Sequence, residues 1–249
     1  MTTRRNSVPR LPGIRRGVCG SALALLAASA LGATGAPAPA TAAAKPSTSR
    51  PLVLLLQSHT ARVRPDAHAQ RIEAVAARRP LTRVRTVLPV LGEAAHGSWL
   101  RVRLPGRPNG HTGWIAAART RPASSEWSIE VDLSARRVAV YQGDRQVRRF
   151  AAVVGAPSTP TPRGRFFVEE ALRLAPSAAG GPYALATSAR SNVYAEFEGG
   201  PGQIALHGRN HLAGSLGTAA SHGCVRLGTR AITWLARHIG AGTPLNITR

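Results

Sequence analysis

The sequence predicts a mainly β protein: a β-sandwich-like C-terminal domain with one or two short helices, preceded by a small β-barrel. Short runs of alternating apolar and polar residues recur from residue 52 to the C-terminus. Tight turns separate these runs, in keeping with 25 glycines and 19 prolines among 249 residues. Only one segment repeats its apolar residues with the period of a helix.

The small barrel is predicted over residues 52–118. Strand-like runs cover residues 52–56, 86–91 and 99–104, and Trp114-Ile115 closes the set. In the third run, apolar residues at even positions alternate with arginines at odd ones. Short strands, tight turns and no amphipathic helix are typical of a small barrel.

The β-sandwich is predicted over residues 126–249. Apolar and polar residues alternate from Ile129 to Leu133, and a turn at residues 142–144 joins the next two strand-like runs. We expect residues 119–125 to be a polar connection between the two domains. Further strands are expected at residues 166–169, 192–197, 204–206 and 245–248.

One helix is predicted near the C-terminus. Its apolar residues have the spacing i, i+3, i+4 and i+7, which places them on one face. Thr229 is expected to cap its start, and Gly240 stands where a C′ glycine would follow its end. The apolar face consists of Ile232, Leu235, Ala236 and Ile239.

Residues 1–44 have the three-part layout of an export signal, which predicts an exported protein. Five arginines precede an Ala- and Leu-rich run at residues 18–31, and small residues follow. The apolar run is short for a membrane span, so we expect cleavage, with an uncleaved anchor as the alternative. Arg15 and Arg16 leave both general and twin-arginine export open. Residues 45–51 are predicted to be a flexible linker.

The net charge of +22 has two interpretations. Lys45 is the only lysine, so 32 of the 33 basic residues are arginines, as a GC-rich genome would produce. The functional interpretation is attraction to a polyanion. The arginines are scattered and stand beside no nucleic-acid-binding motif, so we expect anionic wall polymers rather than nucleic acid as such a partner.

Without the export signal, which contains Cys19, the chain has one cysteine. A solitary cysteine in an exported protein is either buried and inert or a working thiol. Its neighbours favour the second interpretation, because Cys224 follows His222 and Gly223, and His207 ends a predicted strand upstream. An imidazole that accepts the thiol proton makes cysteine a useful nucleophile at neutral pH.

Four segments carry a resemblance to the YkuD-type L,D-transpeptidases. Residues 221–227, SHGCVRL, resemble the signature [S/T]-H-G-C-x-[R/N], and His207-Gly208 resembles the H-G motif that precedes it. Residues 159–164, TPTPRG, are similar to the upstream T-P-T-P-x-G loop, and residues 242–247 to a closing G-T-P-x-x-I. The family often has Asn where this chain has Arg226.

A second resemblance covers the predicted barrel. Residues 99–115 are similar to the W-x-x-V…G-W-I hairpins of bacterial SH3-like domains. Such domains often accompany wall enzymes, which implies a wall-binding module, with a structural spacer as the alternative.

The L,D-transpeptidase resemblance implies a reaction on peptidoglycan stem peptides. Cys224 would attack the carbonyl after the third residue of a tetrapeptide stem and release the terminal D-Ala. His207 would accept the thiol proton, oriented by a backbone carbonyl such as that of Gly208. An amine of a neighbouring stem would resolve the thioester into a 3→3 cross-link, whereas water would make the enzyme an L,D-carboxypeptidase. No cofactor is implied, and we expect a monomer.

The remaining site residues have supporting roles, and two of them have two interpretations each. His222 is expected to position substrate, and the backbone N–H groups of Gly223 and Cys224 to meet the oxyanion. Ser221 either takes part in the chemistry or fixes the turn through backbone hydrogen bonds. Arg226 either binds a substrate carboxylate or pairs with a structural acid, Glu196 or Glu198.

Two hypotheses outside this chemistry remain. A zinc site could use His207, His211, His222 and Cys224, although the spacing of the first two does not bring their rings together in a loop. Alternatively, the protein could be a non-catalytic wall-binding protein that acts through the SH3-like region.

Overall fold

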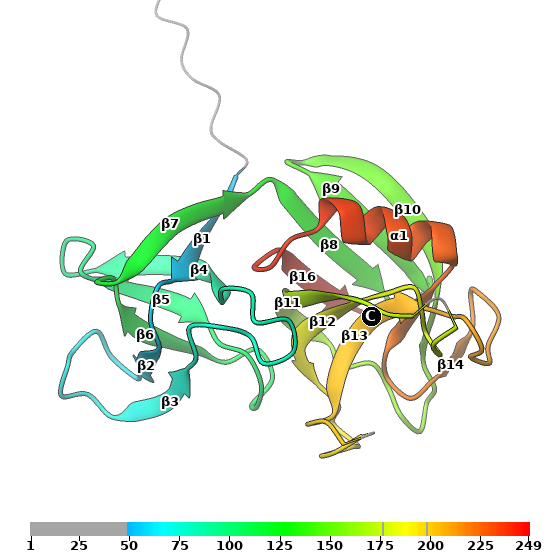
Figure 1. Ribbon diagram of the computed structural model, residues 1–249, viewed down its shortest axis with the longest axis horizontal. Helices are drawn as coiled ribbons and strands as arrows, with labels where there is room; N and C mark the ends of the chain where they lie inside the picture. Colours follow the sequence, from blue (N-terminus) through cyan, green and yellow to red (C-terminus); the bar gives the residue numbers. More distant parts are fainter. Residues whose placement is uncertain (1–48, 176, 198) are drawn as a thin grey trace, which may run out of the picture. The chain divides into compact units, whose positions relative to one another are not determined.

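The computed structural model describes residues 49–249, apart from residues 176 and 198 (Figure 1). The predicted export signal lies outside the described residues. The predicted linker is wrong at its end, because Arg50 and Pro51 already belong to the first strand. In chain order, the elements are β1 Arg50–Leu55, β2 His59–Arg62, β3 Arg71–Val75, β4 Val87–Ala94, β5 Trp99–Arg103, β6 Thr112–Ala116, β7 Thr120–Ser125, β8 Trp127–Asp132, β9 Arg137–Gln142, β10 Arg145–Gly155, β11 Gly164–Arg173, β12 Tyr183–Arg190, β13 Gln203–Gly208, β14 Ala219–Ser221, β15 Val225–Leu227, α1 Thr229–His238 and β16 Pro244–Thr248.

The first seven strands form one sheet in the order β3-β2-β6-β5-β4-β1-β7. In β5, Leu100 and Val102 are buried and Arg101 is exposed, as the alternation predicts. The polar connection predicted over residues 119–125 is wrong, because Thr120–Ser125 is strand β7 and pairs with the whole of β1. Backbone hydrogen bonds hold this edge strand, so most of its side chains stay in solvent and no apolar alternation marks it.

The last nine strands form a second sheet in the order β14-β10-β15-β13-β12-β11-β16-β8-β9. Two strands are shared between its two layers. The first part of β10 pairs with β9 and its end with β15 and β14, while β11 pairs first with β16 and then with β12. The apolar core lies inside this folded sheet, which confirms a mainly β, sandwich-like fold.

The sequence did not predict β12, and one strand that it predicted beside β12 does not form. Strand β12 was not expected, because its residues YALATSAR are mostly small and lack the β-branched and aromatic pattern of a typical strand. The strand predicted over residues 192–197 is wrong. These residues form a loop, in which a single bridge between Phe197 and Gly200 is the only ladder contact of its described part.

The predicted helix is confirmed as α1, but its predicted N-cap is wrong. Gly228, rather than Thr229, is the N-cap, and no side chain caps the helix. The helix ends at His238 with Ile239 as the C-cap, so Gly240 stands at C′ as predicted, although it does not adopt a left-handed conformation. The apolar face packs into the second core, with Ile232 and Leu235 fully buried. Trp234 is only partly buried and packs against this core.

Strand β11 is buried on both faces. Phe166 belongs to the core of the second sheet, whereas Phe167 belongs to the core of the first. Residues 166–170 are therefore an unbroken buried run rather than an alternating one. The described residues from 49 to 249 accordingly belong to one compact unit.

A buried ionic group reinforces this contact. Glu169 of β11, which is fully buried, pairs with Arg79 from the β3–β4 connection and accepts a hydrogen bond of 3.0 Å from Arg190 of β12. Glu170 accepts hydrogen bonds from the backbone N–H and the hydroxyl of Thr82, at 2.8 and 2.7 Å. Burial lowers the pKa of Arg190 to about 10, so its guanidinium remains charged at neutral pH. A buried carboxylate of this kind needs such partners.

Among the described residues, no helix is long and apolar enough to cross a membrane.

Phe167→Ala should destabilise residues 50–125 and 126–249 together. Removing a fully buried phenylalanine ring costs about 3–5 kcal/mol, and this ring lies in the core of the first sheet although its strand belongs to the second. We expect a single urea-unfolding transition at a lower midpoint. Phe150→Ala, at a partly buried position, should cost less. Two separate transitions in the variant would show that the cores are independent.

Candidate active site

The candidate site is built on the parallel pair β13 and β15. Leu206 lies beside Val225, and His207 lies beside Arg226. Cys224 immediately precedes β15, and the backbone N–H of Ala205 donates a hydrogen bond to its Sγ at 3.4 Å. Because side chains alternate along a strand, Ala205 and His207 share the face on which the sulfur lies. The intervening Leu206 is buried in the core.

The thiol of Cys224 is half-buried and not in a disulfide. Its sulfur lies 4.0 Å from the Gln203 carbonyl oxygen. The N–H of Ala205 stabilises a thiolate more than a thiol, because a hydrogen bond to the charged form favours that form. Sequence reasoning did not anticipate this donor, since a backbone group leaves no mark in the residue pattern.

The imidazole of His207 is held in one orientation. Its Nδ1 lies 2.6 Å from the carbonyl oxygen of Gly208. A carbonyl can only accept, so Nδ1 carries the proton and Nε2 is left as the acceptor in the neutral ring. Burial lowers the pKa of His207 and is the largest effect. The hydrogen bond to the Gly208 carbonyl raises the pKa by less, and the charge of Arg226 lowers it further. The imidazole is therefore neutral at pH 7.

Gly180, the first residue of a Gly180-Gly181 pair, lies directly against this imidazole. A Cβ at Gly180 would lie 2.7 Å from His207 Nδ1, and Gly180 has a φ of +76°. A Cβ at Gly208 would overlap the carbonyl oxygen of Gly181. Sequence reasoning missed this contact, for which the Gly180-Gly181 doublet was the available signal.

The turn before Cys224 is held by Ser221. Its hydroxyl donates to the Cys224 carbonyl at 2.6 Å and accepts from the Gly223 N–H at 3.2 Å. Gly223 adopts a φ of +116°, which an L side chain rarely does. Ser221 thus fixes the turn through the backbone, and an oxyanion at the Gly223 N–H would have to displace the Ser221 hydroxyl.

The TPTPRG loop is hydrogen-bonded to the same turn. Thr159 donates from its hydroxyl to the Ser221 carbonyl at 2.9 Å, and Thr161 donates to the Gly223 carbonyl at 2.8 Å. Both threonines are buried. The loop therefore borders the site and sets the backbone of the Cys224 turn.

His222 lies on the exposed side of the turn, against two aromatic rings. Its ring centroid is 6.2 Å from that of Tyr194 and 5.8 Å from that of Phe197. The two aromatic rings also contact each other, at 5.5 Å. Both belong to the loop that the sequence predicted as a strand, so this aromatic wall was missed.

Arg226 is 7% exposed, and its Nη1 donates to the Ala213 carbonyl at 2.6 Å. Within the described part of the chain, the predicted pairing with Glu196 is not formed, and Glu198 lies outside it. Arg226 instead ties the loop after β13 to β15, directly beside His207.

The residues of the hypothetical zinc site are not arranged as ligands. In the part of the chain that the structure describes, no three His, Cys, Asp or Glu side chains could hold a metal ion together. His211 stands on an exposed loop with a φ of +56°.

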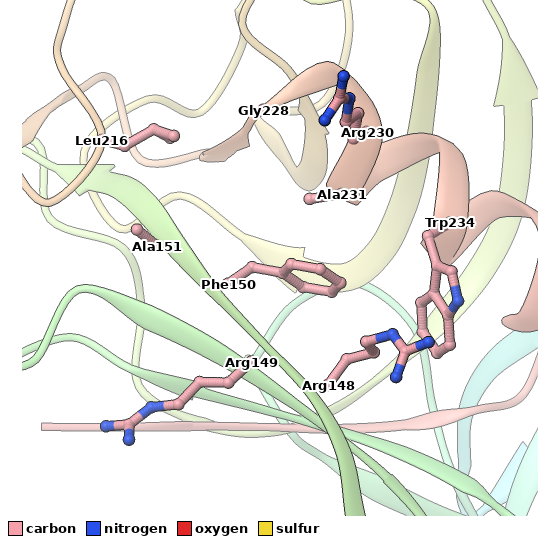
Figure 2. Close-up of a pocket in the computed structure, with 9 residues that line it drawn as sticks. All are labelled: Arg148, Arg149, Phe150, Ala151, Leu216, Gly228, Arg230, Ala231 and Trp234. Atoms are coloured by element: carbon pink, nitrogen blue, oxygen red, sulfur yellow. The ribbon is translucent and has the colours of Figure 1, made fainter.

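A separate pocket of about 460 Å³ lies between β10 and α1 (Figure 2). Figure 2 shows Phe150 between Ala151 and Trp234, with the guanidinium groups of Arg149 and Arg230 directed away from each other. The guanidinium of Arg148 lies 5.3 Å from the Trp234 ring centroid. The pocket is lined by none of the predicted catalytic residues.

A β-sandwich in which a cysteine immediately precedes one strand, and a backbone-oriented histidine lies on the strand paired with it, defines a candidate acyl-transfer site. The sequence model of YkuD, described as the L,D-transpeptidase catalytic domain, matches residues 126–247. A Bacillus licheniformis protein named Putative L,D-transpeptidase YkuD is 31% identical over 127 residues, 51% of this chain and 68% of the relative. The chain belongs to the YkuD L,D-transpeptidase family.

Solved L,D-transpeptidases are also similar to this chain. One from Mycobacterium smegmatis is 20% identical, over 79% of this chain and 99% of that one, with a TM-score of 0.41. One from Enterococcus faecium is 20% identical with a TM-score of 0.38, and the match spans half of each chain.

Gly180→Ala should displace the His207 ring and leave the protein folded. The new Cβ would lie too close to Nδ1, so the hydrogen bond to the Gly208 carbonyl should break. Gly97→Ala is a matched control, because Gly97 has a similar φ of +83° and its Cβ would meet only an ordinary contact. We expect similar melting temperatures but a changed His207 ring resonance only in Gly180→Ala. Unchanged His207 resonances in that variant would contradict the contact.

Arg226→Gln should raise the pKa of His207. Removing the neighbouring cation removes one cause of the lowered pKa, so the ring should protonate at a higher pH than in the wild type. Arg226→Lys keeps the charge and should leave the midpoint closer to that of the wild type. Nuclear magnetic resonance titration of the labelled imidazole measures all three. A wild-type midpoint above 6.5 would contradict the effect of burial.

Proposed function

We propose that the chain is an exported peptidoglycan L,D-transpeptidase that forms 3→3 cross-links through a thioester at Cys224. The observation that carries the proposal is the position of the Cys224 sulfur. It lies beside the Ala205 N–H on the strand face that also carries His207, whose Nδ1 is held by a carbonyl. A cysteine nucleophile needs a base on its own side of the sheet, and this shared face supports His207 in that role.

In the acylation step, Nε2 of His207 accepts the thiol proton and Sγ attacks the carbonyl after the third stem residue. The tetrahedral intermediate collapses when the imidazolium returns the proton to the leaving nitrogen of D-Ala. The product is a thioester on Cys224. His207 is suited to both steps because its neutral form predominates at pH 7, so a proton gained from sulfur is readily given up.

In the second step, a side-chain amine of a neighbouring stem attacks the thioester carbonyl. His207 takes the proton of this amine, and Cys224 leaves as the thiolate. Water in place of the amine would make the enzyme an L,D-carboxypeptidase, which is the second outcome of the assay below.

His222, Tyr194 and Phe197 form the exposed wall beside the nucleophile, where a stem peptide would lie. We assign substrate positioning to His222. The Cys224 turn supplies backbone N–H groups for the oxyanion, with the Gly223 N–H engaged by Ser221 before substrate binds.

The regions outside the catalytic domain support a wall location in this proposal. Residues 1–44 direct export, and residues 52–118, with the hairpin of β5 and β6, are an SH3-like module of the wall enzyme. The arginines that line the pocket between β10 and α1 are suited to bind anionic wall polymers. No acidic residue lines the pocket, so their positive charge is not balanced there.

Incubation with a purified disaccharide-tetrapeptide should give a cross-linked dimer with loss of D-Ala, detected by mass spectrometry. Imipenem, which is bound in a solved L,D-transpeptidase structure, should add one covalent adduct to the wild type. Cys224→Ala should abolish both reactions, because the sulfur forms the covalent bond. Tripeptide without dimer would indicate the carboxypeptidase. Dimer formation by Cys224→Ala would place the nucleophile elsewhere.

A further inference from the structure

The loop between β12 and β13 is closed by one side chain from the first sheet. The Arg107 guanidinium donates to the carbonyls of Ser191 at 2.7 Å, Tyr194 at 2.9 Å and Pro201 at 3.0 Å. The first two carbonyls lie at the start of the loop and the third at its end. A planar guanidinium has the fork of donors needed to hold three carbonyls at once.

A second side chain of the same hairpin fixes the point where β12 ends. Asn109 donates from Nδ2 to the Arg190 carbonyl at 2.7 Å and accepts from the Arg190 N–H at 2.8 Å. Its amide thus pairs with Arg190 as a neighbouring strand would. Nδ2 also lies 3.1 Å from the Asn192 side-chain oxygen. The β5–β6 hairpin therefore holds both the loop and its origin.

The loop depends on these hydrogen bonds because little packing supports it. A hollow of about 560 Å³ lies between the hairpin and the start of the loop. Val193 is 51% exposed and Phe197 is 41% exposed. The Tyr194 backbone is held at both of its polar groups, because its N–H donates to the Ser191 hydroxyl at 3.0 Å and its carbonyl accepts from Arg107. The bond from Arg107 is charge-assisted, which is the stronger kind, and it is the restraint that comes from outside the loop.

The restraint on the Tyr194 backbone also affects the candidate active site. Tyr194, whose carbonyl Arg107 holds, contacts the ring of Phe197, and both contact His222. His222 is two residues from Cys224. A displaced Tyr194 backbone would move the aromatic wall but would leave Cys224 and His207 on their paired strands.

We propose that Arg107 is a positioning residue for donor binding: the first sheet clamps the β12–β13 loop and so sets the wall that Tyr194 and Phe197 form against His222. This inference rests on the proposed function for its substrate, a peptidoglycan tetrapeptide stem. The clamp itself is independent of that function.

Arg107→Ala should raise KM for the disaccharide-tetrapeptide about tenfold, with kcat changed less than about twofold. The binding wall moves while the nucleophile and base do not, and a change confined to KM reports such a loss of binding. Hydrogen–deuterium exchange should become faster in residues 191–197. Arg107→Lys should recover only part of both effects, because an ammonium cannot reproduce the planar fork.

Arg101→Ala is the matched control. It removes the same charge from the same hairpin, and Arg101 is exposed with one hydrogen bond of 3.3 Å to Thr112. KM and exchange should equal those of the wild type. Unchanged KM and unchanged exchange in Arg107→Ala would overturn the clamp, as would an equal effect of Arg101→Ala.

A double-mutant cycle tests the link from the clamp to the wall. Phe197→Ala should raise KM by a similar factor, and Phe197→Ala with Arg107→Ala should raise it no further, since both act through one wall. Multiplicative effects would overturn the link. A wild type without turnover would refute the proposed function alone, because faster exchange in Arg107→Ala would still show the clamp.

Discussion

The parallel pairing of β13 with β15 is the constraint on which the candidate site depends. With Leu206 beside Val225, the residue before β15 must stand next to Ala205, and that residue is Cys224. Alternation along the strands then puts the sulfur, His207 and Arg226 on one face and the apolar residues in the core. A slip of one residue would turn the sulfur toward the core, so the same apolar burial that stabilises the sheet also sets the chemistry.

Much of the surrounding structure resists such a slip. Thr159 and Thr161 hold the backbone on one side of the Cys224 turn, and Ser221 closes the turn from within. On the outer side, β11 contacts the first-sheet region through the buried Phe167 and through Glu169, which pairs with Arg79, and β12 contacts it through the Arg190 backbone. The strands that support the nucleophile are thus stabilised by two cores. Residues 50–125 therefore contribute to the stability of these strands.

The parts of the fold that the sequence predicted are those with a local signal. The alternation in β5 and β8, the helical spacing in α1 and the motif around Cys224 each lie within a few residues. Edge strand β7 and central strand β12 were missed, because one is polar on both faces and the other is built from small residues. The contacts around the site could not be predicted either. Arg107 and Tyr194 are 87 residues apart, and the donor to the sulfur is a backbone N–H, which every residue but proline carries.

In the proposed mechanism, the His207 imidazole accepts the proton of the Cys224 thiol. The most direct measurement is the rate at which iodoacetamide alkylates Cys224 at pH 7, in the wild type and in His207→Gln, followed by intact-mass spectrometry. We expect the alkylation rate in the variant to be about one tenth of the wild-type rate or less, because the thiol loses its proton acceptor. Equal rates in two folded proteins would contradict this mechanism, since the imidazole would then have no effect on the sulfur.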